Sequence, residues 1–354
     1  MLFKRLLSTS RNLCTMELKE VVKQLNQFAP TSLAEKWDNV GILIEPSSPL
    51  EVKKVLLTND LTPPVMNEAV QLGTNLIISY HPPIFTGMKC VTQKTWKERI
   101  VTTCLENRIA VFSPHTSYDC VQGGVNDWLI QAFDVDDVRP VQQTSELQDG
   151  ITNSISFSIT SQQSLEELKK ELVPLSNVKI WPVVWSDTDC KVNIGCSEQL
   201  IGNLVPLVQK YTDQFIEVKQ MSKVPKPGFG MGRKGKLKTG ITVDEAVQIV
   251  KSHLQLSSVR LAKSPDADII NTVAVCAGSG GSLLRDIKAS LYLTGEMSHH
   301  EVLHAVYNGS NVILCDHSNT ERGFLKVLKT KLQNLLPGID IYVSTIDRDP
   351  LEIV

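Results

Sequence analysis

The sequence lacks the features that would place it at once in a specialised class of protein. Its 354 residues include 36 Lys and Arg against 38 Asp and Glu, so the formal net charge is −2, without the basic excess that nucleic-acid-binding proteins usually carry. No uninterrupted apolar run approaches the roughly 20 residues that a membrane-spanning helix needs. We therefore expect neither direct contact with nucleic acid nor insertion into a membrane.

Cysteine pairs and aromatic residues are also scarce. The chain has 8 cysteines, none of them in a C-x-x-C pair, and only 6% of its residues are aromatic. Cys276 and Cys315 lie in apolar, strand-like runs, where a free thiol behaves as a small hydrophobic side chain. We find no apolar signal-peptide core with a small-residue cleavage site, so we expect reduced thiols rather than a disulfide framework.

The first fifteen residues differ from the rest of the chain. Residues 1–15 include three basic residues and four Ser or Thr, and no acidic residue. This composition is typical of an amphipathic mitochondrial transit peptide, so it predicts a mitochondrial protein. The alternatives are a terminus without regular structure, or translation from Met16, which would give a cytoplasmic or nuclear form.

Residues 16–140 alternate apolar, strand-like runs with segments of helical periodicity. The expected strands are 52–60, 74–85 and 109–119, and the expected helices are 17–30, 62–73 and 95–108. Prolines stand in the first turn of helix 62–73, and Gly73 is placed to close it. Strands and helices that alternate in this way predict βαβ units and a mostly parallel sheet.

Residues 236–354 repeat the same alternation. A helix begins at Thr242, which forms a capping box with Glu245. The expected strands are 271–278, 290–295, 311–316 and 339–345, and the expected helices are 242–254, 281–289, 296–306 and 320–336. We interpret 16–140 and 236–354 as two halves of one split α/β unit, with its ligand site at the carboxyl ends of the strands.

The segment between these halves has a different order of elements. Residues 150–223 read strand, helix, strand, strand, helix, strand, which is the ferredoxin-like pattern. A Pro- and Gly-rich stretch, 223–236, follows and marks the exit from this segment. The fold class that the sequence predicts is therefore α/β, one split unit interrupted by a ferredoxin-like inserted domain.

Histidines paired with carboxylates stand just past three expected strands. They are His81, His115 with Asp119, and His317 with Glu321. The spacing of His317 and Glu321 puts both side chains on one face of a helix, so they can converge on one ion. Imidazole and carboxylate without thiolate suit Zn, Fe, Mn, Co or Ni, and bridging carboxylates would allow two ions. Each of these elements taken alone favours a hydrogen-bonded histidine or a solvated pair of side chains, whereas the three together favour a metal site.

A second histidine cluster, GEMSHHEVLH, opens the helix expected at 296–306. It contains Glu296, His299 and His300, and His300 shares a helical face with His304. One interpretation is a role at the metal, either in supporting its ligands or in proton transfer, with Glu296 and His300 as the candidates for proton transfer. The other is ordinary helix polarity, because an acidic residue near a helix N-terminus is favourable in any case.

Two glycine-rich stretches lead to different conclusions. Residues 230–235 match G-x-G-x-x-G, but no expected strand precedes them, so we reject a dinucleotide site. Arg233 and Lys234 in that stretch are candidates for a phosphate contact or for a solvated loop. Residues 279–282 run from a strand into a helix, so their backbone amides could hold an anion or form a tight turn.

An ordered series of motifs spans nearly the whole chain outside the insert. The motifs are WDNVG (37–41), TND (58–60), SYHPPIF (79–85), SPHTSYD (113–119), GVNDW (124–128), GMGR (230–233), CAGSG (276–280), LTGEMSHHE (293–301), HSNTERG (317–323) and DRDP (347–350). In these motifs the sequence resembles the Nif-three-like family, also described as GTP cyclohydrolase I type 2 homologues. The resemblance implies a dinuclear metal site, homo-oligomers that are typically toroidal hexamers, and an inserted domain similar to the PII/CutA group.

Carried over by motif, the resemblance implies that His81, Asp119, His317 and Glu321 are metal ligands. Many members of the family carry a His-His-Pro sequence where this chain has Tyr80-His81-Pro82. A protonated phenol is a poor metal ligand, so this departure puts one of the two divalent ions in question. His115 is our candidate for the replacement imidazole.

Three functions are compatible with these residues. The first is a metal-dependent hydrolase for a small phosphorylated or nucleotide-like substrate, with Glu321, Glu296 or His300 transferring protons. The second is a non-catalytic adaptor or transcriptional regulator with structural metal ions, because the family is named after an interaction with a transcriptional co-activator and thus implies a transcription-related protein partner. The third is a metal chaperone with exchangeable ions.

Overall fold

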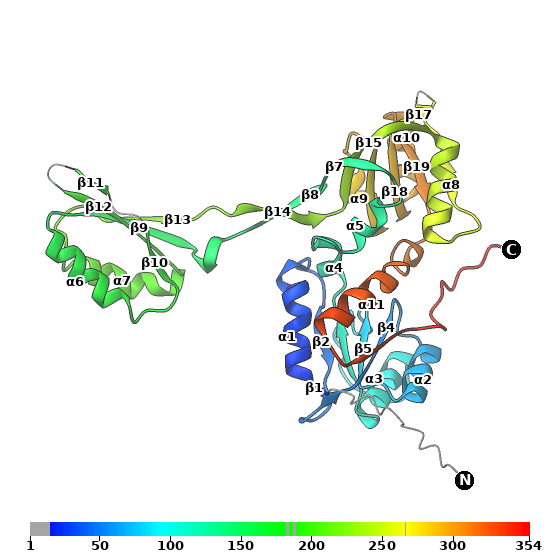
Figure 1. The fold of residues 1–354 in the computed structure, drawn as a ribbon, viewed down its shortest axis with the longest axis horizontal. Helices are drawn as coiled ribbons and strands as arrows, with labels where there is room; N and C mark the ends of the chain where they lie inside the picture. The colour runs from blue at the N-terminus through cyan, green and yellow to red at the C-terminus, as the bar shows by residue number, and fades with distance from the viewer. Residues whose placement is uncertain (1–14, 182–183, 187–188, 266) are drawn as a thin grey trace, which may run out of the picture. The chain divides into compact units, whose positions relative to one another are not determined.

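The computed structural model describes residues 15–354 except 182–183, 187–188 and 266 (Figure 1). Residues 1–14, which hold most of the expected transit peptide, lie outside the described part. The chain divides into two compact units. Unit 1 combines the described residues up to Gln143 with Gly228–Val354, and unit 2 is Thr144–Pro227.

The first sheet of unit 1 is mostly parallel. Its order is β2 (Gly41–Ile44), β6 (Ala110–Ser113), β5 (Leu76–Ser79), β4 (Lys54–Thr58) and β20 (Asp340–Val343). All neighbouring strands run parallel except β2, which is antiparallel to β6. A short antiparallel pair, β1 (Met16–Glu17) and β3 (Glu51–Val52), lies outside this sheet.

Helices cover both faces of the first sheet, which is why its strands are apolar throughout. They are α1 (Leu18–Phe28), α2 (Pro63–Leu72), α3 (Trp96–Glu106) and α11 (Phe324–Leu335). Along β4, Leu57 packs in one core with α1 and α11, whereas its neighbour Leu56 packs in another with α2 and α3. Successive strand residues point to opposite faces, so one apolar run fills two layers. The helix α2 begins at Pro63 and ends at Gly73, which has the left-handed φ of 65°.

The second sheet of unit 1 has six strands. Their order is β16 (Arg260–Ala262), β19 (Asn311–Leu314), β18 (Leu291–Glu296), β17 (Ile269–Ser279), β15 (Arg233–Thr242) and β7 (Val135–Arg139). The strands β17, β18 and β19 are parallel, and the remaining pairs are antiparallel. Its helices are α5 (Val125–Ile130), α8 (Val243–Leu254), α9 (Gly281–Leu284) and α10 (His299–Tyr307), and the short helix α4 (Thr116–Cys120) packs against α5. The capping box expected at Thr242 and Glu245 opens α8.

Unit 1 therefore contains two large sheets, whereas the sequence predicted one split α/β unit without dividing its strands between two sheets. The two halves of the chain exchange one strand each. The strand β20, from the end of the chain, pairs with β4, and β7, from the first half, pairs with β15. One continuous hydrophobic core joins residues of both sheets, which makes unit 1 compact.

The stretch 223–236, expected to be an irregular exit, forms strands instead. It contains β14 (Val224–Met231), which pairs with β8 (Gln142–Glu146), and the start of β15. Gly230 has a φ of 151°, and a Cβ there would lie 2.1 Å from the carbonyl oxygen of Gln142. Gly230 thus lets the two strands approach closely. The Pro- and Gly-rich composition of 223–236 does not by itself tell such a strand from a loop.

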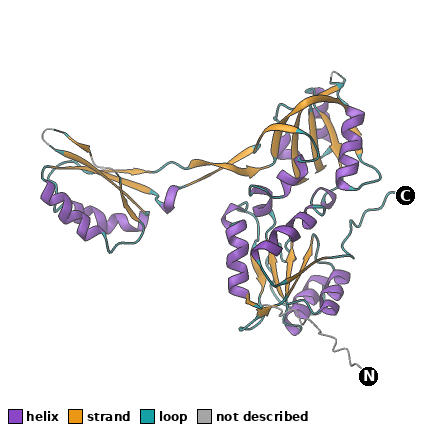
Figure 2. Cartoon of the chain, viewed as in Figure 1, coloured by secondary structure: helices purple, strands orange, loops and turns teal. Residues whose placement is uncertain are grey.

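Unit 2 folds around its own core. Its elements in chain order are β9 (Asn153–Ile159), α6 (Gln162–Leu172), β10 (Val178–Ile180), β11 (Val184–Trp185), β12 (Cys190–Cys196), α7 (Ile201–Val208) and β13 (Glu217–Gln220). The antiparallel sheet has the order β10-β12-β9-β13, with β11 also paired to β12. Both helices lie on one face of this sheet (Figure 2). Alternate residues of β9, such as Phe157, pack there against Leu165 and Leu168 of α6.

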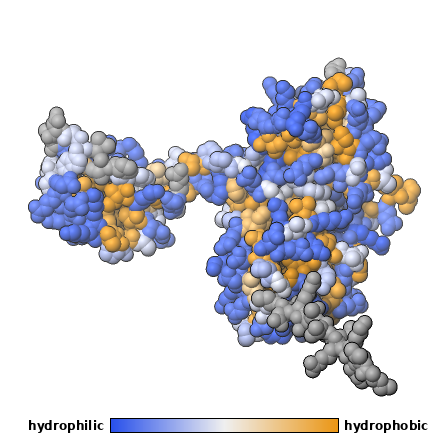
Figure 3. All heavy atoms as spheres, viewed as in Figure 1, coloured by the Kyte–Doolittle hydropathy of each residue, from blue (hydrophilic) through white to orange (hydrophobic). Residues whose placement is uncertain are grey.

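The surface is largely hydrophilic on the face drawn in Figure 3, and the described cysteines are free thiols. Hydrophilic residues cover much of the face drawn in Figure 3, with hydrophobic patches between them. No helix in the described part of the chain is both long and apolar enough to cross a membrane. Cys104, Cys276 and Cys315 are buried free thiols, as expected.

Arg233 is neither a phosphate contact nor part of a solvated loop. Its side chain is 1% exposed, and its guanidinium forms a bidentate ion pair with Asp127, at 2.6 and 3.0 Å. It also donates to four backbone carbonyls, those of Val121, Gly228, Gly230 and Gly232. A buried guanidinium satisfied in this way fastens the loop after α4 to the start of β15.

We predict that Arg233→Ala destabilises unit 1 by about 3–5 kcal/mol, because it leaves the Asp127 carboxylate without its buried partner. Lys234→Ala, at the next and half-buried position, is the matched control and should change stability by less than about 0.5 kcal/mol. Calorimetric unfolding of the full chain measures both. Equal effects of the two substitutions would contradict the role assigned to Arg233.

Candidate metal centre

Polar side chains follow the carboxyl ends of the parallel strands in both sheets of unit 1. In the first sheet, Asp60 follows β4, His81 follows β5 and His115 follows β6. In the second sheet, Glu296 ends β18 and His317 follows β19. Ligands of open α/β sheets bind at this edge. The two edges meet, because His81 from the first sheet lies 3.3 Å from Glu321, which follows β19 of the second sheet.

Three of the predicted ligands converge. The donor atoms of His81, His317 and Glu321 all lie within 4.8 Å of one another. Glu321 stands between the imidazoles, with Oε2 3.3 Å from His81 Nε2 and Oε1 3.5 Å from His317 Nε2. Its side chain is 3% exposed. His317 and Glu321 flank a short 3₁₀ turn, Ser318–Thr320, rather than lying within a regular helix, and their expected proximity holds.

Each imidazole is held from behind by a second carboxylate. Asp60 Oδ1 lies 2.9 Å from His81 Nδ1, and Glu296 Oε1 lies 2.6 Å from His317 Nδ1. Both imidazoles therefore turn Nε2 towards Glu321. A carboxylate on the far nitrogen is the usual companion of a metal-bound histidine, because it fixes the tautomer and the orientation of the ring.

The residues of this cluster fit a divalent metal ion. His81 Nε2 is buried and faces Glu321 Oε2, with no other partner among the described residues, so its lone pair becomes available to an ion once its proton leaves. Gly278 has a left-handed φ of 64°, and a Cβ at that position would lie 2.7 Å from Glu321 Oε1 and 3.0 Å from His317 Nε2. Only glycine leaves this side of the cluster open. Two imidazoles and one carboxylate match the donor sets of catalytic zinc and related ions.

The charges of the cluster shift its pKa values in opposite directions. Burial disfavours the imidazolium of His81, but the charge of Glu321 and the hydrogen bond with Asp60 outweigh it and raise the pKa of His81 to about 10. Burial also opposes ionisation of Glu321, and the charge of His81 prevails and lowers its pKa. Without an ion, His81 therefore carries the compensating charge for the buried carboxylate.

Asp119 and His115 stand beside this group without joining it. Tyr80 Oη donates a hydrogen bond to Asp119 Oδ1 at 2.5 Å, and burial raises the pKa of Asp119 to about 7 against that hydrogen bond. His115 Nδ1 lies 2.7 Å from Asp38 Oδ1, and its ring centroid is 5.4 Å from that of His81. Both were expected to be ligands, and that role stays a prediction.

The family model described as Duf34/NIF3 (NGG1p interacting factor 3) matches residues 16–350. The chain belongs to this family. NIF3-like protein 1 of Bos taurus is 42% identical over 98% of this chain and 94% of the bovine protein. NGG1-interacting factor 3 of Saccharomyces cerevisiae is 32% identical over 97% of this chain and 99% of the yeast protein.

The fold of this NIF3 family member also matches a solved structure. Staphylococcus aureus protein SA1388 aligns with a TM-score of 0.79 and 24% identity, over 96% of this chain and 99% of that one. At this level of identity the match supports the mixed α/β fold alone. The family expected from the motifs is confirmed by the family model and by the relatives named above.

The second histidine cluster divides between the centre and the surface. Glu296 contacts His317, as described above. His300 is exposed, and its ring packs against that of His299, with centroids 5.4 Å apart. His304, expected to share a face with His300, has its Nε2 3.7 Å from Asp286 Oδ1, and the same nitrogen accepts a hydrogen bond from the side-chain amide of Asn308 at 3.0 Å. A proton-transfer role for His300 stays a prediction.

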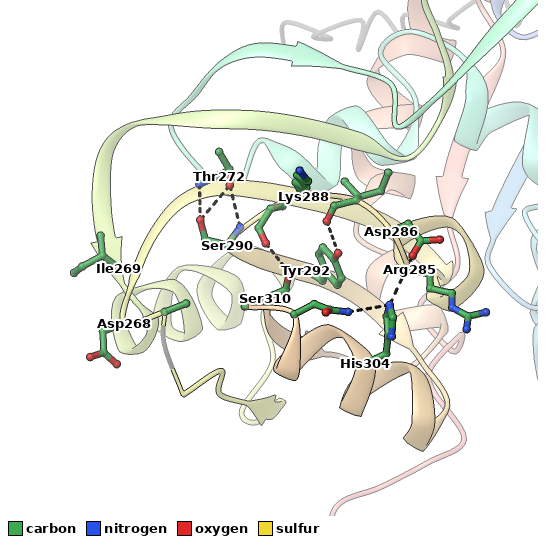
Figure 4. A pocket seen from close by; sticks show the side chains of 15 residues that line it. Asp268, Ile269, Thr272, Arg285, Asp286, Lys288, Ser290, Tyr292, His304 and Ser310 are labelled. Carbon is green, nitrogen blue, oxygen red and sulfur yellow. Dashed lines mark hydrogen bonds and ion pairs between the residues drawn. The ribbon is translucent and has the colours of Figure 1, made fainter.

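His304 lines a separate cavity of about 920 Å³, shown in Figure 4. This cavity lies at the amino ends of β17, β18 and β19, the sheet edge opposite to the metal centre. Several of its polar groups bond to one another, as the dashed lines of Figure 4 show for Thr272 with Ser290. Its charged residues have both signs, among them Arg285 and Asp286, so it does not select a ligand charge.

The glycine-rich segment 279–282 forms a tight turn rather than an anion site. The amide of Gly280 donates to Thr294 Oγ1 at 3.0 Å. The carboxylate of Glu301 lies against Gly281, where a Cβ would be 2.3 Å from Oε2. A fixed anion and an amide already in use both disfavour a second anion there.

Sequence reasoning missed the residues that support the ligands. Asn59 donates to Glu321 Oε2 at 3.0 Å, and Asp60 and Asp38 hold His81 and His115. Asn59 and Asp60 are the last two residues of the strand expected at 52–60 and directly follow β4, so the strand-end rule already applied to them. They were overlooked because only histidines and their near neighbours were considered.

We predict that the apparent affinity for Zn²⁺ rises about tenfold per pH unit between pH 6 and 9. The ion-free protein holds a proton on His81, with a pKa of about 10, and that proton must leave before Nε2 can bind a metal. Competition with a chromophoric chelator at several pH values measures the slope. His253→Gln, on α8, is the control and should leave it unchanged. An affinity independent of pH would contradict the prediction.

Proposed function

We propose that this protein is a metal-dependent hydrolase that acts on a small phosphorylated or nucleotide-like substrate. The observation that carries the proposal is the buried Glu321 carboxylate between two imidazoles whose Nε2 atoms face it. Three protein donors leave further coordination positions to water or substrate, as catalytic metal sites do and closed structural sites do not.

In this proposal the residues of the centre have two roles, binding the ion and orienting its ligands. His81, His317 and Glu321 would hold the ion, and Asp60 and Glu296 would fix the two imidazoles. The bound ion would supply Lewis acidity and lower the pKa of a water molecule. Among the groups expected to transfer protons, Glu321 and Glu296 lie in the centre, whereas the exposed His300 does not contact it. We therefore assign proton transfer to one of these two carboxylates.

A cavity beside the centre supports the substrate class. It measures about 590 Å³, and its walls include His81, His115 and His317. Phe85 and Trp96 offer aromatic faces to a planar base, and Lys97 and Arg348 offer positive charge to a phosphate. Its size is ordinary for a small-molecule site. A nucleotide-like molecule could thus reach the ion while its ring contacts the aromatic side chains and its anionic group contacts the basic ones.

The test is hydrolysis of a panel of nucleotides and phosphoesters by the metal-free protein and by protein loaded with Mn, Zn, Fe or Co. We expect turnover only in the loaded protein, and a loss of about 10²-fold or more in His317→Ala because the ion is lost with its ligand. Lys238→Ala, on the exposed part of β15, should be as active as the wild type. No turnover with any of the four metals would refute the proposal.

A non-catalytic adaptor is the second candidate function. It is favoured by the name of the yeast relative, which describes an interaction with NGG1. In this function the ions would be structural, and unit 2, which has its own core, would be available to a partner. Co-purification with the NGG1 homologue of the same organism, with and without residues 144–227, distinguishes it. If this chain is an adaptor, it should bind the NGG1 homologue, keep its own ion when a chelator is added, and hydrolyse none of the compounds in the panel.

We further propose that unit 2 is a ferredoxin-like domain of the PII/CutA type. Numbered in chain order without β11, its four strands lie in the antiparallel order 2-3-1-4, with both helices on one face. We retain two proposals from the family and from residues 1–15, a homo-hexamer and a mitochondrial location. Light scattering of the purified chain tests the first. Imaging of the full chain against one that starts at Met16 tests the second.

A further inference from the structure

Tyr80 and Asp119 form a buried pair at the edge of the metal centre. The phenol donates to Asp119 Oδ1 at 2.5 Å, and the two residues are 2% and 8% exposed. Tyr80 directly precedes His81, and its ring packs edge-on against those of His81 and His115, with centroids 5.3 and 5.9 Å apart. The carboxylate that would belong to a second ion is therefore already bound to a protein donor.

From this arrangement we infer that the protein holds one divalent ion per chain, bound by His81, His317 and Glu321, and that the Tyr80–Asp119 pair takes the place of a second ion. The inference rests on the proposed metal site. It differs from the two ions that the family resemblance implies.

Geometry supports one ion. Metal–ligand bonds to nitrogen and oxygen measure about 2.0–2.2 Å, so two ligands of one ion lie at most about 4.4 Å apart. Among the described residues, His81, His317 and Glu321 are the group of three donors that comes near this limit. Neither Asp119 nor His115 joins any such group with the donors around it.

Glu321 lies within the group of three donors. Its Oε2 accepts a hydrogen bond from Asn59, and that amide comes from the end of β4, which the sheet holds in place. The two Glu321 oxygens face the two imidazoles of the same group, Oε2 towards His81 and Oε1 towards His317. The carboxylate therefore belongs to the group that would hold the single ion.

His115 is fixed away from the group. Its Nδ1 is bonded to Asp38, whose other oxygen accepts from both the amide and the hydroxyl of Thr116. His115 itself has a φ of 36°, in the left-handed region that non-glycine residues rarely adopt. The backbone conformation and the anchored Asp38 hold the imidazole where it is, and there it does not join the group of three donors.

The test is the number of Zn²⁺ ions bound per chain. Metal-free protein is loaded with excess Zn²⁺, cleared of weak ions with a mild chelator, and analysed by mass spectrometry for metal against protein concentration. We expect one ion in the wild type and one in each of Tyr80→Phe, Asp119→Asn and His115→Gln. His317→Ala and Glu321→Gln should fall below a tenth of an ion.

The three conservative variants are controls for one another, because each alters the edge of the centre without removing a donor of the group. Their melting temperatures in the metal-free state show whether the fold is kept. Two ions in the wild type, or a loss of the ion in Tyr80→Phe, Asp119→Asn or His115→Gln, would overturn the single-ion assignment and leave the proposed function standing. A wild type that binds no ion would overturn both.

Discussion

The buried carboxylate of Glu321 is the constraint on which the rest of unit 1 depends. An ionised group at this depth is stable only when its charge is compensated, and the imidazoles of His81 and His317 lie on either side of it. One imidazole comes from each sheet. The strands of both sheets must therefore end at the same place, and the exchanged strands β7 and β20 join the two halves that carry them.

The sequence predicted the three side chains that converge better than it predicted their surroundings. His81 follows a recognisable apolar strand, and His317 and Glu321 are four residues apart, so local pattern was sufficient for both. Asp38 supports His115 from 77 residues away, and no local pattern connects such a pair. The two sheets were missed for the same reason, since periodicity identifies a strand but not the strand it pairs with. Arg233 was misjudged because a charge is ordinarily solvated, and here six hydrogen bonds make its burial tolerable.

All the residues assigned to the centre belong to unit 1. Unit 2 has a separate hydrophobic core and reaches unit 1 through the chain segments that contain β8 and β14. The residues of the candidate centre and the surface residues of unit 2 can therefore be substituted independently of one another. The proposed hydrolase and adaptor functions are therefore compatible within one chain.

The exchanged strand β20 has a consequence for the time at which the centre forms. It occupies residues 340–343 of 354, yet it is the edge of the sheet that carries His81. During synthesis the first half of the chain leaves the ribosome with that edge of β4 unpaired. The sheet is complete only after β20 has emerged, and β20 follows His81, His317 and Glu321 in the chain, so the strand that completes the sheet of His81 is made after every donor of the candidate centre.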